Sequence, residues 1–217
     1  LYTMLLAGFP NMLKTLSGQS DFIVGTPSDN REHPQLHNLI GFFVNTLPLR
    51  ISLTDKTSAA SLIGALHHTL SEAKANQALP FEKLVSALNV PRDTSRHPLF
   101  QTMFSLQSFG SNSANHGDTQ FGRIIPTGSS TESVARYDLS LFMDDSQSAI
   151  QGRFNFAVSL FHRSTIEHYT ELFVESLKAL VALPNSSLSQ QAMLTGSDKE
   201  IVFQYQKATD QIEHTRS

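Results

Sequence analysis

The chain has 217 residues, of which 40% are hydrophobic and 16% are charged. This composition supports a sizeable hydrophobic core and excludes a largely disordered chain. The formal net charge of −3 favours neither a nucleic acid nor a membrane surface as a partner. Because the chain has no cysteine, disulfides, thiolate metal sites and cysteine nucleophiles are excluded, and we expect no bound metal. No apolar run reaches the roughly 20 residues of a membrane span, so we expect a cytoplasmic location.

Apolar residues predict four helices and six strands along the chain. The expected helices cover residues 1–16, 58–75, a short stretch after Pro80, and 163–182. The expected strands cover residues 21–27, 40–53, 98–106, 120–126, 137–143 and 149–158. Strands and helices are interspersed without a repeat of fixed period. The fold class is therefore α/β, with one mixed central sheet and helices on at least one face.

Particular residues should mark the ends and edges of these elements. Thr57 or Ser58 is expected to cap the second helix, and Ser164 or Thr165 the last one. Pro48 lies inside an expected strand and must take an edge or bulge position, because it has no N–H to donate. The first helix has no N-cap before its apolar pattern begins, so we expect the chain to be a piece of a longer protein.

Three ordered segments carry a more specific pattern. They are residues 40–50 (IGFFVNTLPLR), 76–82 (NQALPFE) and 92–100 (RDTSRHPLF). In this order they resemble the last three core motifs of nonribosomal peptide synthetase condensation domains, with Asn76 standing where the family usually has His. Residues 137–139 and 154–161 match weaker downstream features of that family, and residues 192–205 are similar to the connector into an adenylation domain. The resemblance implies a C-terminal subdomain over residues 1–186 and a linker towards an adenylation domain over residues 187–217.

The resemblance also implies a fold and a reaction. Condensation domains resemble chloramphenicol acetyltransferase, with two similar lobes facing each other across a tunnel. Thioesters on carrier proteins enter from opposite ends, and the downstream amine attacks the upstream thioester to form an amide. The catalytic His of the family belongs to an HHxxxDG loop in the N-terminal lobe, which this sequence lacks. We therefore expect one lobe of an amide-forming enzyme that is inactive alone.

The implied partners are the N-terminal condensation lobe, the peptidyl and aminoacyl carrier proteins, and the adjacent adenylation domain. No cofactor is expected to bind directly, since the phosphopantetheine arm of the carrier proteins brings the substrates. An isolated lobe should leave its inter-lobe surface bare, and a large apolar patch usually finds a partner, so we expect self-association. We expect residues 92–107 to include the piece that crosses to the other lobe.

Asn45 is the main candidate site residue, and Thr46 beside it is assigned to the same substrate-binding surface. The resemblance places this motif near the active centre, where a carboxamide with two donors and an acceptor would orient the thioester or the pantetheine arm. A buried Asn that satisfies neighbouring backbone groups is the other interpretation. The remaining motif residues are interpreted as structural: Arg31, Arg50, Pro80, Phe81, Arg92, Asp93, Arg96 and Asp138.

Residues 67–73 (HHTLSEA) match the two His positions of the missing HHxxxDG motif. Glu72 replaces its Asp and Ala73 replaces its Gly. The segment also falls inside an expected helix, where His67 and His68 point about 100° apart, so only one can face a given partner. We interpret this pair as helical surface histidines.

Two other functional interpretations remain open. The first is a non-catalytic module that binds carrier proteins or neighbouring domains. The second keeps the acyltransferase fold but assigns the lobe to epimerisation or heterocyclisation, against which the family form of the motif at residues 92–99 argues.

Overall fold

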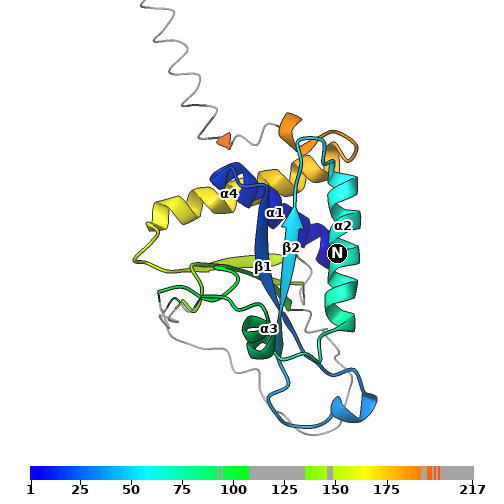
Figure 1. Ribbon diagram of the computed structural model, residues 1–217. Helices are drawn as coiled ribbons and strands as arrows, with labels where there is room; N and C mark the ends of the chain where they lie inside the picture. The colour runs from blue at the N-terminus through cyan, green and yellow to red at the C-terminus, as the bar shows by residue number, and fades with distance from the viewer. Residues whose placement is uncertain are drawn as a thin grey trace, which may run out of the picture.

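In the part of the chain that the structure describes, five strands form one mixed sheet in the order β2-β1-β3-β4-β5 (Figure 1). The computed structural model describes residues 1–91, 93, 95–107, 135–145, 149–191, 195, 196, 198 and 200. The strands are β1 Asp21–Ser28, β2 Asn45–Ser52, β3 Thr102–Gln107, β4 Leu139–Asp144 and β5 Gln151–Phe156. The helices are α1 Tyr2–Ser17, α2 Ala59–Ala75, α3 Phe81–Ala87 and α4 Arg163–Ala182, with short 3-10 turns at Pro34–Leu36 and Leu188–Gln190.

The central strands are parallel and both edges are antiparallel. β1 pairs with β3 and β3 with β4 in parallel, whereas β2 and β5 run antiparallel to their neighbours. β2 is an edge strand of the described sheet, and its Pro48 lies opposite Gly25 of β1. The edge position that Pro48 required is therefore confirmed, because an edge tolerates a residue without an N–H.

The strand expected over residues 40–53 begins later, at Asn45. The last pair of the β1–β2 ladder joins Ser28 to Asn45. Beyond it, Asn30 takes a left-handed backbone (φ 52°). Residues 40–44 therefore have no partner strand in β1, and Ile40 and Phe42 point their apolar side chains into solvent.

Three helices cover one face of the sheet and bury the main core. α1 contacts both α2 and α4, and all three pack against inward-facing residues of the strands (Figure 1). Ser58 caps α2 through a reciprocal pair of bonds with Ser61, as one of the two capping candidates predicted. The largest fully buried side chains of this core are Phe9, Phe104, Leu6, Met12, Leu49, Leu62, Leu66, Leu141 and Leu180.

A smaller cluster lies on the opposite face. Consecutive residues of a strand point to opposite faces, so Phe104 enters the main core while Met103 enters the second cluster. Phe81 of α3, Phe100 and Tyr137 complete this second cluster. The mixed α/β architecture is therefore confirmed, with a smaller apolar cluster on the face opposite the three long helices.

Several expected boundaries were wrong. The strand expected from residue 98 starts at Thr102, because Leu99 takes a left-handed backbone (φ 69°) that no strand accommodates. β3 is also the middle strand of the sheet, so residues 102–107 do not cross to another lobe. α4 begins after His162 with no side-chain cap, so neither Ser164 nor Thr165 caps it.

Other expectations lie outside the described residues. These include the strand at 120–126 and most of the connector segment at 192–205. The segment expected to be a linker, residues 187–217, starts with residues that pack on the lobe. Leu188 is 5% exposed in the main core, and Ser187 bridges to Ser58. Among the described helices, none is long and apolar enough to cross a membrane.

Candidate functional site

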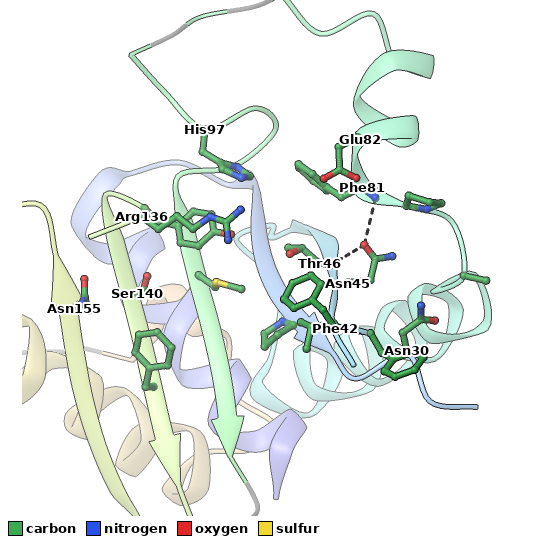
Figure 2. A pocket seen from close by; sticks show the side chains of 18 residues that line it. Asn30, Phe42, Asn45, Thr46, Phe81, Glu82, His97, Arg136, Ser140 and Asn155 are labelled. Atoms are coloured by element: carbon green, nitrogen blue, oxygen red, sulfur yellow. Dashed lines mark hydrogen bonds between the residues drawn. The ribbon is translucent and has the colours of Figure 1, made fainter. Parts of the chain in front are cut away.

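A pocket of about 580 Å³ opens on the sheet face opposite α1, α2 and α4 (Figure 2). Residues from all three motif segments line it: residues 42–46 of the first, residues 78 and 80–82 of the second, and His97 of the third. Residues of β3, β4 and β5 also line it, together with Pro27, Asn30, Arg136 and Tyr137. The segments that carry the family resemblance therefore converge on one cavity, which is the candidate functional site.

Asn45 lies at the rim of this pocket, and its carboxamide is fully engaged by the protein. Its Nδ2 donates to the carbonyl oxygens of Gln77 and Leu79, both at 2.8 Å. Its Oδ1 accepts the backbone N–H of Thr46 at 2.9 Å and of Phe81 at 3.3 Å. These bonds use both donors and both acceptor positions of the carboxamide. The geometry favours the interpretation in which Asn45 satisfies backbone groups and fixes the segment beside β2.

The second motif leads the chain from α2 into α3. Pro80 precedes the first residue of α3, where its fixed φ suits the start of a helix. Phe81 is only 9% exposed, and its ring lies 5.7 Å from that of Phe100 and 5.3 Å from that of His97. Phe81 therefore anchors α3 in the second cluster while its edge lines the pocket.

His97 is held between aromatic rings at one end of the pocket. Its ring centroid lies 4.7 Å from those of both Phe100 and Tyr137, and its Nδ1 lies 2.9 Å from the carbonyl oxygen of Pro98. In the neutral imidazole this contact requires the proton on Nδ1. Burial lowers the pKa of His97, and the positive charge of Arg136 acts in the same direction. The burial of His97 in the pocket wall therefore favours the uncharged form of its imidazole.

The floor of the pocket is a row of side chains from three strands. Met103 of β3 lies opposite Ser140 of β4, which in turn lies opposite Asn155 of β5. Arg136 lies at the wall next to this row, with its guanidinium carbon 5.9 Å from the ring centre of Tyr137 (Figure 2). The lining combines polar and charged side chains with apolar ones, so it offers a ligand hydrogen-bonding groups as well as hydrophobic surface.

The two arginines of the first motif region make local contacts. Arg50 binds both carboxylate oxygens of Asp21 at 2.7 and 3.0 Å across the exposed β1–β2 pair, which lowers the pKa of Asp21. Arg31 donates to the carbonyl oxygen of Leu36, and its guanidinium lies 4.3 Å over the ring of Phe43. Arg50 thus links β2 to β1, and Arg31 links the two ends of the β1–β2 connection through its contacts with Leu36 and Phe43.

The third motif begins with Arg92, Asp93 and Arg96, which we interpret from the sequence as structural residues. Arg92 lies outside the described residues. Asp93 accepts both the backbone N–H and the hydroxyl of Ser95, at 2.8 and 2.6 Å, and these bonds lower the pKa of Asp93. The charge of Arg96 also lowers the pKa of Asp93, and the backbone N–H of Arg96 donates to the backbone carbonyl oxygen of Asp93 at 3.4 Å. Asp138 is partly buried and does not line the pocket.

The histidine pair of α2 is remote from the pocket lining. His67 and His68 are both exposed, and Nδ1 of His68 lies 3.3 Å from a carboxylate oxygen of Glu72. This is an ordinary surface pair one helical turn apart. The described residues contain no group of three or more His, Cys, Asp or Glu side chains that could hold a metal ion.

Sequence reasoning missed several residues of the site. His97 and Gln77 lie within quoted motifs, but nothing in the one-dimensional pattern showed which motif positions face the cavity. Arg136 and Ser140 carry no motif, and Asn155 lies in a segment with only weaker family features. Alternation along β4 and β5 could have placed Ser140 and Asn155 on the open sheet face, whereas Arg136 precedes β4 and carries no such signal.

Comparison with known proteins identifies the family. The family model described as Condensation domain matches residues 1–202. Bacitracin synthase 3 of Bacillus licheniformis is 37% identical over 202 residues, and gramicidin S synthase 2 of Brevibacillus brevis is 34% identical over 203 residues. These matches cover 93% and 94% of this chain, but only 3% and 4% of the two synthetases.

Solved structures show the same fold. The four-domain nonribosomal peptide synthetase AB3403, bound to AMP and glycine, has a TM-score of 0.78 at 21% identity over 90% of this chain and 16% of its own. The X-domain from teicoplanin biosynthesis has a TM-score of 0.76 at 20% identity over 89% of this chain and 44% of its own. The class is therefore the chloramphenicol acetyltransferase-like fold. Within that class, the chain belongs to the condensation domain family of nonribosomal peptide synthetases.

Proposed function

We propose that this chain is one lobe of a condensation domain that forms amide bonds between thioesters carried by carrier proteins. The observation that carries the proposal is the convergence of the three motif segments on one pocket of the open sheet face. In this reaction the amine nitrogen of the acceptor forms a bond to the thioester carbonyl carbon. The carbon–sulfur bond breaks, the thiol leaves, and the amine gives up one proton.

The lobe would contribute a wall of the reaction tunnel rather than its proton acceptor. His97, Ser140 and Asn155 offer hydrogen-bonding groups to a substrate, and Met103 and Phe42 offer apolar surface. Asn45 and Thr46 would act by shaping the rim where the pantetheine arm passes. The partners in the proposal are an N-terminal lobe, two carrier proteins and an adjacent adenylation domain.

The direct test blocks the pocket in the complete synthetase that carries this lobe. Asn155→Trp on β5 should fill the pocket and reduce amide formation between two loaded carrier proteins at least about tenfold. Gln151→Trp, on the same face of β5 but outside this pocket, is the matched control and should retain turnover. Mass spectrometry of the carrier-bound product measures the turnover of both variants. Equal turnover in the two variants would contradict the assignment of this pocket to the reaction.

The isolated chain is expected to be inactive, because it contains no HHxxxDG loop and its one similar segment is an exposed helical pair. Two loaded carrier proteins incubated with the chain should yield no amide product. Turnover comparable to an intact domain, abolished by His68→Ala, would reject this expectation.

A second candidate function is a non-catalytic docking module. It is favoured by the structural likeness to an X-domain from teicoplanin biosynthesis that was solved in complex with OxyB, with a TM-score of 0.74. The fold can therefore serve in a protein–protein complex. Titration of this chain with a carrier protein, followed by NMR, should show localised shifts if docking is its role. Absence of shifts at high carrier concentration would count against it.

A further inference from the structure

Gln77 is a buried polar side chain of the second motif, and it joins three segments of the pocket rim. It is 9% exposed, and its Oε1 accepts a hydrogen bond from the hydroxyl of Ser28 at the end of β1. Its Nε2 donates to Oε1 of Glu32 at 2.9 Å, and its backbone carbonyl accepts from Asn45. A carboxamide suits this position because it supplies one acceptor and one donor group on the same plane.

The segments that Gln77 joins form facing parts of the rim. The β1–β2 connection, residues 29–44, brings Phe42, Phe43 and Val44 to the pocket. The α2–α3 connection, residues 76–80, leads to Pro80 and Phe81 at the same pocket. The β1–β2 connection has only a short 3-10 turn of its own, so its position relative to the pocket depends on side-chain contacts such as those of Gln77.

We infer that Gln77 is a positioning residue that sets the width of the pocket, by tying the β1–β2 connection to the α2–α3 connection. Its side chain touches none of the reacting groups of the proposed function. Its loss should therefore weaken substrate binding, seen as a higher KM, and leave the chemical step with a nearly unchanged kcat. The identity of the ligand, an aminoacyl pantetheine, rests on the proposed function, whereas the tie between the two connections does not.

An exchange of donor and acceptor tests this role. Gln77→Glu alone places a carboxylate against Glu32 and removes the donor. The double variant Gln77→Glu with Glu32→Gln restores the bond with its direction reversed, and Ser28 can still donate to residue 77. Gln19→Glu, on an exposed turn, introduces the same charge elsewhere and serves as the control.

The first readout is binding of an aminoacyl pantetheine amide, a stable mimic of the thioester, to the chain by NMR titration. Gln77→Glu should raise the Kd about tenfold at neutral pH, through lost hydrogen bonding and like-charge repulsion. The double variant and Gln19→Glu should both stay within about twofold of the unchanged protein. Wild-type affinity in Gln77→Glu, or a double variant as weak as the single one, would overturn the inference.

The second readout is amide hydrogen exchange, which needs no ligand. Gln77→Glu should speed exchange in residues 76–81 and 30–45 while β3 and β4 keep their protection, and the double variant should restore protection. Faster exchange throughout the molecule, or no change at the rim, would contradict a positioning role. If the unchanged protein does not bind the mimic, the proposed function fails for the isolated chain, and the exchange result still decides the role of Gln77.

Discussion

Asn45 illustrates how a motif residue can shape a pocket through bonds to the backbone. Its four hydrogen bonds reach Thr46 and three residues of the second motif, and together they hold the corner from which α3 starts. The interpretation in which the carboxamide of Asn45 satisfies neighbouring backbone groups accounts for both its oxygen and its nitrogen. Asn45 therefore contributes to the rim by holding the neighbouring backbone in place.

Asn45→Ala should lower the free energy of unfolding by about 1–3 kcal/mol, because two carbonyl oxygens and two N–H groups lose their partner. Urea denaturation of the chain measures this change. Asn38→Ala, at an exposed position of the β1–β2 connection, should stay within about 0.5 kcal/mol of the unchanged protein. A similar loss in both variants would show that Asn45 holds nothing specific.

His97 predicts a pH dependence of stability. Burial lowers its pKa in the folded state, so the unfolded chain takes up a proton first as the pH falls below about 6.5. Stability should therefore decrease from about pH 7.5 to about pH 5.5, and the loss stops growing once the pH is below the folded-state pKa. His97→Phe keeps the ring contacts with Phe100 and Tyr137 but cannot titrate. Denaturant melts at the two pH values should show a smaller loss in His97→Phe, and an equal loss would refute the argument.

At the scale of elements, two adjacent stretches of the first motif behave differently. The part from Asn45 onward pairs with β1, whereas residues 40–44 leave the sheet because β1 has already ended. The apolar side chains of residues 40–44 predict a strand. A side-chain pattern, however, does not reveal where the partner strand ends. α2, with its own periodicity and its own cap at Ser58, depends far less on distant partners.

A pair of glycine substitutions tests the close packing of Phe100 against β1. An alanine methyl group at Gly25 of β1 would overlap the ring of Phe100, whereas at Gly64 of α2 it would meet no atom within 4 Å. Gly25→Ala should therefore destabilise the fold by about 1–3 kcal/mol. Gly64→Ala should stabilise it by about 0.5–1 kcal/mol, since alanine favours a helix. Thermal unfolding of both variants measures the difference, and a stable Gly25→Ala protein would contradict the packing at the second cluster.

At the scale of the whole molecule, the two faces of the sheet differ in how they are covered. Three long helices and the main core occupy one face, and the pocket lies on the other. Near that pocket Ile40 is fully exposed and Phe42 is 91% exposed. Exposed apolar side chains beside a functional cavity are typical of a surface that another lobe or protein covers.

The isolated chain should therefore self-associate. Light scattering over a concentration series should show a mass that rises with concentration, and Ile40→Ser with Phe42→Ser should shift the series towards the monomer. Val181→Ser removes an exposed apolar side chain from α4, on the opposite side of the sheet, and should change nothing. A strict monomer at every concentration, or equal effects of both changes, would refute this prediction.

The sequence alone determined the α/β class, the four helices, the order of the motifs and the condensation domain resemblance, because periodicity, caps and motifs are properties of neighbouring residues. The tertiary structure decided which motif atoms meet. Asn45 bonds to residues 32 to 36 positions further along the chain, and His97 packs against Tyr137 from a distant segment. Such contacts depend on how distant segments pack around one core, and no local pattern encodes the distance between two side chains.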